Sequence, residues 1–139
     1  IYMSFIRRKG GTKTIYLPVT TSTAFTKDTL VTFSGGYITA AAAGTASADI
    51  VGVIRKTIAS TDSDYATARF VPVEVPTERF TVWEADVTSG LVAADVLKEV
   101  DLTDAGTVDR SASSVKAVRC VQRISATKGL FLVKFMGSY

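Results

Sequence analysis

The segment ADIVGVIRKTI at residues 48–58 decides the fold that we expect for this chain. It is almost continuously apolar and rich in β-branched residues, and small or turn-forming residues bracket it at 44–47 and 60–63. Such a run predicts a β-strand covered on both faces, because a strand with one face in water would alternate apolar and polar residues. Gly52 in its middle favours a β-bulge or a close approach of another backbone.

The pattern that leads into this segment occurs twice. Residues 27–38 combine a short apolar strand with a Gly-Gly turn before the run at 48–58, and residues 94–108 combine a similar strand and turn before the apolar run at 117–121. We therefore expect two similar antiparallel units packed together in one domain. Turn signals recur without a long helical period, which predicts an all-β chain of about eight to ten short strands, arranged as a compact β-sandwich or barrel.

Three prolines predict where this sheet has its edges. Residues 14–20 and 69–75 alternate apolar and polar side chains and read as half-buried strands. A proline has no N–H to donate to a neighbouring strand, so strands that contain it are expected at an edge. The candidate edge-strand contact residues are Pro18, Pro72 and Pro76.

Residues 1–13 are expected to form an extended N-terminal arm, and residues 14–139 a single β domain. The candidate residues for contact with a neighbouring subunit are Phe5, Ile6, Arg7, Arg8 and Lys9. Two of them are apolar and three are cationic, and two glycines follow as a flexible joint. The alternative is a frayed, solvated tail, but a tail without a partner gains little from two apolar residues.

Little in the sequence points to catalysis or to a cofactor. The chain has no histidine, which removes the usual general base and the usual zinc ligand. The single cysteine, Cys120, lies in an apolar strand pattern and is expected to be a buried, inert thiol. Asp62 and Asp64 would share one face of a strand, but their polar neighbours favour a solvated turn. We expect no enzyme activity, no metal and no cofactor.

Composition argues against nucleic acid, membranes and small-molecule substrates as partners. The net charge of +3 is modest and spread along the chain, whereas a nucleic-acid-binding protein usually concentrates its basic residues on one face. No apolar stretch approaches the roughly 18 residues that would span a bilayer. The aromatic residues fall in different segments without regular spacing, which favours packing roles over a platform for sugars or bases.

The chain resembles the small capsid cement, or head decoration, proteins of tailed bacteriophages. The resemblance rests on Gly36-Tyr37-Ile38 leading into residues 48–53, and extends loosely over residues 20–136. Members of that family often carry a lysine-glycine-aspartate-x-valine series; here Lys27-Asp28-Thr29-Leu30 stands in its place without the glycine. Residues 94–113 also look like part of a phage structural protein of this size.

This resemblance implies a β-tulip or a related barrel, and a non-catalytic protein that binds the outside of a capsid and stabilises it. It implies the major capsid protein as partner, self-association (most often as trimers) and an arm that clasps neighbouring capsid subunits. The protein would be made in the host cytoplasm and located on the outer surface of the virion.

Other classes of function stay open at this stage. One is a different virion component, such as a head fibre base, a tail tube subunit or the shell subunit itself. Another is a carbohydrate-binding β-sandwich, which would need clustered exposed aromatic residues. A hydrolase built on Asp62 and Asp64 comes last.

Overall fold

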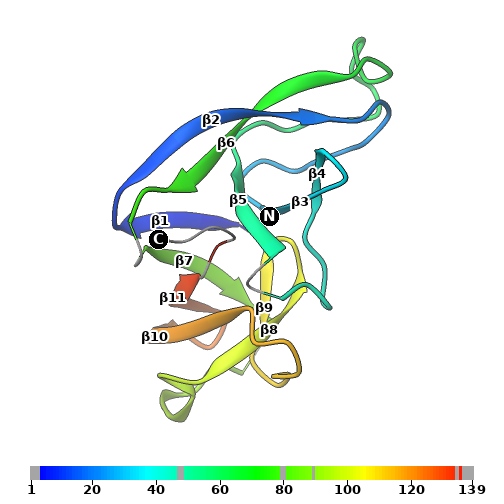
Figure 1. Cartoon of the computed structure of the whole chain (residues 1–139). Helices are drawn as coiled ribbons and strands as arrows, with labels where there is room; N and C mark the ends of the chain where they lie inside the picture. The colour runs from blue at the N-terminus through cyan, green and yellow to red at the C-terminus, as the bar shows by residue number, and fades with distance from the viewer. Residues whose placement is uncertain (1–3, 47–48, 79–80, 89, 134, 136–139) are drawn as a thin grey trace.

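The structure, a computed structural model, describes residues 4–46, 49–78, 81–88, 90–133 and 135. Its strands form two mainly antiparallel sheets joined by a long bent ribbon (Figure 1). The first sheet contains β1 (Phe5–Lys9), β7 (Val82–Val87), β8 (Glu99–Asp104), β9 (Thr107–Asp109), β10 (Val118–Ser125) and β11 (Lys128–Val133). The second contains β2 (Thr12–Val19), β3 (Leu30–Ser34), β4 (Tyr37–Ala40), β5 (Ile50–Ile54) and β6 (Arg69–Pro76). A short 3-10 turn, Ala93–Asp95, precedes β8. The prediction of a compact all-β fold is confirmed.

The first sheet closes into a five-stranded barrel. Its order is β7-β11-β10-β8-β9, and β9 returns to pair in parallel with the end of β7 at Asp86 and Val87. β1 pairs with the remaining length of the same edge of β7. The interior is filled by large apolar side chains, among them Trp83, Phe131 and Leu102, which are buried. The barrel therefore contains the main hydrophobic core.

The second sheet curls around a smaller apolar cluster, in the order β2-β6-β5-β3-β4. β5 contributes to both clusters, because Ile50 and Val53 pack into the barrel core and Ile54 packs into the smaller one. This confirms that residues 50–54 are covered on both faces. The strand is shorter than residues 48–58 suggested: Ile58 lies beyond it and forms an isolated bridge with Phe25.

β5 approaches β6 closely at Gly52. A Cβ atom at this position would overlap the carbonyl oxygen of Glu74 and would lie 2.9 Å from Cγ1 of Val73. The pairing of β5 with β3 also shifts by one residue beside Gly52, between Val31 and Thr32. The prediction of a close backbone approach at Gly52 is confirmed, and a bulge accompanies it.

The internal repeat is visible in the topology. Each unit forms a hairpin whose first strand pairs with a later third strand: β3 and β4 with β5, then β8 and β9 with β10. Asp28 and Leu97 precede the two hairpins with φ angles of 67° and 74°. Their N–H groups donate to the carbonyls of Ile54 and Cys120 at 2.8 and 2.7 Å. Two segments with little sequence identity therefore share the same backbone arrangement.

Residues 5–9 do not form an arm separate from the domain. They form strand β1, which pairs antiparallel with β7, and the N–H of Phe5 donates to the Asp28 carbonyl at 2.7 Å. Phe5 is 0% exposed and belongs to the barrel core. Burial of this aromatic ring holds the segment in place, so the domain begins at the first strand and the boundary after residue 13 does not stand. The part of the expected arm at residues 1–3 lies outside the described residues.

The edge prediction is right for one proline and wrong for two. Pro18 lies in β2, which is an edge strand. Pro72 and Pro76 lie in β6, which runs between β2 and β5. β6 accommodates Pro72 because it takes part in the pairing with the β5 segment only through its carbonyl, which accepts the N–H of Arg55 at 2.9 Å. Pro76 is the last residue of β6.

Candidate functional site

The segments that flank the bend between the sheets form one long two-stranded ribbon. β1 continues into β2 along one side, and β6 continues into β7 along the other (Figure 1). The bend lies at Gly10, whose φ is 92°, and at Gly11, whose carbonyl accepts the N–H of Thr77 at 2.9 Å. Glu78 accepts the N–H of Gly11 at 2.9 Å. The glycines expected as a flexible joint are therefore hydrogen-bonded into a turn.

The outer face of β2 and β6 exposes two aromatic rings. Tyr16 and Phe70 are 65% and 67% exposed, the largest fractions among the exposed large apolar residues. Tyr16 lies opposite Pro72, and Phe70 lies opposite Pro18. Since residues opposite each other in an antiparallel pair share a face, all four side chains lie together on the outer surface. We call Tyr16, Pro18, Phe70 and Pro72 the ribbon patch.

The ribbon patch follows from the alternating direction of successive side chains along β2 and β6. Val71 and Val73 face inward and are buried in the smaller core, so their even-numbered neighbours must face outward. Pro76 is also on β6, but it is buried at the bend and is not part of the patch. Of the three prolines predicted as contact residues, the structure brings Pro18 and Pro72 together and leaves Pro76 out.

The cationic residues predicted in the arm lie on β1, and Arg7 reaches from there to Glu74 on β6, the strand that carries half of the ribbon patch. Nε of Arg7 donates to Glu74 at 2.9 Å, and Nε of Arg8 donates to Glu84 at 3.0 Å. Both guanidinium groups remain largely exposed, as does Lys9. Ion pairs of this kind contribute little to stability, so these cations are also accessible to a partner. Of the two apolar residues in this group, Ile6 is half-buried and Phe5 has no exposed surface.

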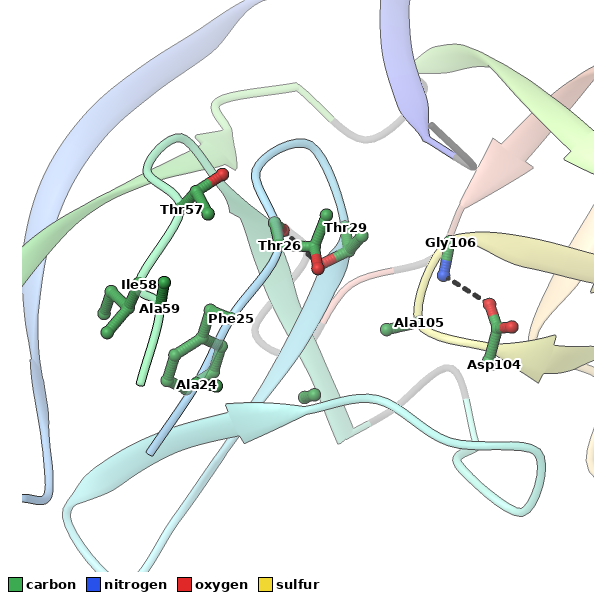
Figure 2. A pocket seen from close by; sticks show the side chains of 11 residues that line it. Ala24, Phe25, Thr26, Thr29, Thr57, Ile58, Ala59, Asp104, Ala105 and Gly106 are labelled. Atoms are coloured by element: carbon green, nitrogen blue, oxygen red, sulfur yellow. Dashed lines mark hydrogen bonds between the residues drawn. The ribbon is translucent and has the colours of Figure 1, made fainter. Parts of the chain in front are cut away.

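A groove of about 560 Å³ lies where the two sheets meet (Figure 2). Phe25 and Ile58 form part of its lining together with small alanine side chains. Two of its polar side chains bond within the protein: the Thr29 hydroxyl donates to the Thr26 carbonyl at 2.7 Å, and Asp104 accepts the N–H of Gly106 at 2.9 Å. Among the described residues, Asp104 is the sole titratable side chain in the lining. The groove does not assemble an acid–base pair from them.

The buried carboxylate of Asp95 belongs to a structural ion pair. Two nitrogens of Arg110 donate to its two oxygens at 3.0 Å each, and the N–H of Val92 donates at 2.9 Å. These hydrogen bonds lower the pKa of Asp95 despite its burial, and the same contact raises the pKa of Arg110. The pair fixes the turn before β8 against the segment after β9.

A second buried carboxylate, that of Asp101, holds the loop between β9 and β10. It accepts the N–H groups of Ser114, Val115 and Lys116 at 2.8 to 2.9 Å. Three backbone donors hold this carboxylate in place, so it too has a structural role.

The remaining candidates for chemistry have structural roles. Asp62 accepts the N–H of Ala59 at 2.9 Å, and Asp64 pairs with Arg69 at 2.6 Å, so both belong to the turn before β6. Burial raises the pKa of the Cys120 thiol, which keeps it protonated. Within the described ranges, no three histidine, cysteine, aspartate or glutamate side chains gather as a metal site. No helix in the same ranges is long and apolar enough to cross a membrane.

Comparison with known proteins adds no family assignment. A scan against protein-family models and a search of curated protein sequences both found no match to this chain. The ribbon patch and the cations beside it are therefore the features on which a functional argument can rest.

The sequence pattern identifies half of the ribbon patch and misses its aromatic rings. Phe70 is not among the predicted contact residues, although the alternation that buries Val71 and Val73 also places it outward, on the same face as Pro72. Tyr16 has no aromatic neighbour in the sequence, and only the pairing of β2 with β6 supplies one. The signal that could have found Phe70 is the strand alternation at residues 69–75.

Proposed function

We propose that this chain is a non-catalytic structural protein that binds the outer surface of a tailed-phage capsid and stabilises it. The observation that carries the proposal is the ribbon patch, in which Tyr16 and Phe70 are about two-thirds exposed on a rigid, paired surface. Aromatic residues presented in this way are typical anchors of protein–protein interfaces. The sequence resemblance to cement proteins supplies the nature of the partner, the major capsid protein.

In this proposal the protein stabilises the shell through non-covalent contacts alone, without a chemical step. The barrel gives each subunit a stable body, and the ribbon presents the apolar anchors to the shell with Arg7, Arg8 and Lys9 at its side. Each contact is weak by itself, but many copies on one shell act together, and subunits that associate as trimers gain further avidity. The cations add a contribution that salt weakens. In this proposal the protein is made in the host cytoplasm and resides on the outside of the virion.

Co-sedimentation with emptied heads of the phage that encodes the chain tests the proposal. We expect the wild-type protein to sediment with heads and to raise the temperature at which they rupture. The double variant Tyr16→Ser, Phe70→Ser should bind at least about tenfold more weakly, because interface anchors of this kind contribute more than about 1 kcal/mol each. Tyr37→Ser is the matched control: Tyr37 is 42% exposed but lies on β4, so the variant should bind like the wild type.

Absence of wild-type binding to heads would reject the function. If the double variant binds heads as tightly as the wild type, the proposed function stands but the ribbon patch is not the binding surface. Rings of subunits in negative-stain images, in place of head binding, would point instead to a tail tube component.

One observation favours a second function, binding of carbohydrate. Tyr16 and Phe70 are diagonal neighbours across β2 and β6, a spacing at which two rings could stack on one sugar. A glycan array distinguishes the two functions: specific hits abolished by Tyr16→Ser would support a lectin, and an array without hits would remove it.

A further inference from the structure

Antiparallel pairing fixes the direction in which each backbone group of β6 points. The N–H of Thr77, just past the end of β6, donates to the Gly11 carbonyl at 2.9 Å, so the odd-numbered residues of β6 face β2. The N–H of Arg55 donates to the Pro72 carbonyl at 2.9 Å, so the even-numbered residues face β5. The residues of β2 that lie opposite the even-numbered ones are Thr12, Thr14, Tyr16 and Pro18.

These four residues turn their backbone groups away from β6, because opposite residues in an antiparallel pair alternate between bonded and non-bonded positions. Thr12, Thr14 and Tyr16 each present an N–H and a C=O at the edge of the sheet, and Pro18 presents only its C=O. Among the described residues no strand pairs with this side of β2; β4 comes close to β2 without pairing, and Figure 1 shows it beneath the arrowhead of β2. We call residues 12–16 on this side the open edge of β2.

The side chains along the open edge favour an apolar segment that carries an acidic group. On the inner face Ile15 and Leu17 are only half-buried at the margin of the smaller core, and on the outer face Tyr16 is exposed. Lys13 is exposed, and none of the residues that the structure describes forms an ion pair with it. An added strand would cover Ile15 and Leu17, and a carboxylate beside Lys13 would complement its charge.

We infer that an extended, apolar segment of the shell protein, with an acidic side chain near Lys13, adds as a further strand on the open edge of β2. The inference rests on the proposed function and identifies a second element of the interface. The ribbon patch provides side-chain anchors, and the open edge provides main-chain hydrogen bonds. The two elements adjoin at Tyr16, whose ring belongs to the patch and whose backbone belongs to the edge.

Charge disfavours a second copy of the chain as the occupant. The antiparallel register that would pair all three outward residues sets Thr12 opposite Tyr16 of the second copy and Thr14 opposite its own equivalent. In that register the two Lys13 side chains are diagonal neighbours on one face, where like charges repel. A foreign acidic segment meets no such repulsion.

The variant Thr14→Pro tests the inference. It removes the outward N–H and places a ring on the open edge, yet it leaves the hydrogen bonds between β2 and β6 intact, because Thr14 occupies a non-bonded position. Thr14→Val is the matched control, since it alters the same exposed side chain and keeps the N–H. With emptied heads as the probe, we expect Thr14→Pro to bind at least about tenfold more weakly and Thr14→Val to stay within about twofold of the wild type.

The outcomes separate this inference from the proposed function. Wild-type binding with unchanged affinity of Thr14→Pro would overturn strand addition and leave the function standing. Failure of the wild type to bind heads would overturn both. Sedimentation of the free protein is the second measurement: a wild-type dimer that Thr14→Pro abolishes would assign the edge to a second copy and overturn the shell segment. Urea unfolding of Thr14→Pro shows whether the variant is folded. If it is unfolded, hydrogen exchange of residues 12–16, measured by mass spectrometry on the wild-type protein bound to heads, replaces the test. Lack of protection of these residues on heads would then overturn the inference.

Discussion

The two sheets of this protein differ in their edges: the first is closed into a barrel, and the second is open. In the barrel, β9 returns to pair with β7, so the strands from β7 to β11 form a closed ring around Trp83 and Phe131. In the second sheet, β2 and β4 remain as edges, and the outer face of β2 and β6 exposes aromatic rings. A closed sheet has no edge for another chain, whereas an open one does. We therefore expect the barrel to provide most of the stability and, in the function that we propose, the ribbon to provide the binding surface.

The largest difference between the two regions should appear in the free energy of unfolding when the largest barrel side chain is removed. Trp83 is fully buried, its Nε1 donates to Thr81 at 3.0 Å, and its ring lies 5.9 Å from that of Phe135. We expect Trp83→Ala to lower the free energy of unfolding by about 3–5 kcal/mol. Phe70→Ala on the ribbon should change it by less than about 0.5 kcal/mol. Urea unfolding measures both, and a larger loss for Phe70→Ala would reverse the assignment.

A substitution at the junction between the two sheets should lower the free energy of unfolding by less than one in the barrel core, but by a measurable amount. Gly52→Ala would press a methyl group against the Glu74 carbonyl, and we expect a loss of about 1–3 kcal/mol in the free energy of unfolding. Gly44→Ala is the control, because a Cβ atom there meets nothing within 4 Å. If the two alanine variants unfold at the same urea concentration, then β5 and β6 are not in close contact.

The ion pair of the barrel loops should produce a smaller, pH-dependent effect. The pKa of Asp95 is lowered in the folded state by Arg110, so the pair contributes stability at pH values above the ordinary aspartate pKa of 3.8. That contribution is lost as the pH falls through the lowered, folded-state pKa. We expect Asp95→Asn to be less stable than the wild type at pH 7, and the difference to shrink as the solution is acidified below 3.8.

Unfolding curves at several pH values check this prediction. Ser111→Ala is a suitable control, since among the described residues the Ser111 hydroxyl bonds only to Asp109, two residues earlier in the chain. A difference between wild type and Asp95→Asn that grows toward acid pH would contradict the sign derived from the lowered pKa.

The smallest effect concerns reactivity rather than stability. Cys120 is buried in the barrel, and burial raises the pKa of its thiol. We expect it to react with a disulfide reagent at a rate limited by opening of the barrel, so that labelling accelerates in Trp83→Ala and stays slow in Phe70→Ala. Rapid labelling of the native protein would show that the barrel is not closed around this residue.

The sequence predicted the features that depend on local pattern. Alternation and apolar runs identified the strands, paired glycines identified the hairpin at residues 35–36, and the uninterrupted run identified β5 as covered on both faces. The strand and turn expected within residues 94–108 are present as β8, Glu99–Asp104, and the turn before β9, and a 3-10 turn precedes them. Gly52 was interpreted correctly because a glycine inside an apolar strand leaves room that a neighbouring backbone can occupy.

The sequence did not predict the features that depend on distant pairing. Phe5 pairs opposite Ala85, and nothing local in a five-residue segment indicates a partner so far along the chain. Closure of the barrel rests on two parallel residue pairs between β7 and β9, which have no sequence signature. The prediction that Pro72 and Pro76 mark an edge strand was wrong, because the rule for prolines assumes that the neighbouring strand pairs along its full length. β5 pairs with β6 over a short section only.

Amide hydrogen exchange of the protein, free and bound to emptied heads, tests the central claim most directly. In the free protein, the amides of Lys13, Ile15 and Leu17 should exchange slowly because they face β6, and those of Thr14 and Tyr16 should exchange fast. On heads, we expect the exchange of Thr14 and Tyr16 to slow by at least about tenfold, with the barrel amides unchanged. Protection gained in the barrel while β2 stays unchanged would contradict the assignment of binding to the ribbon.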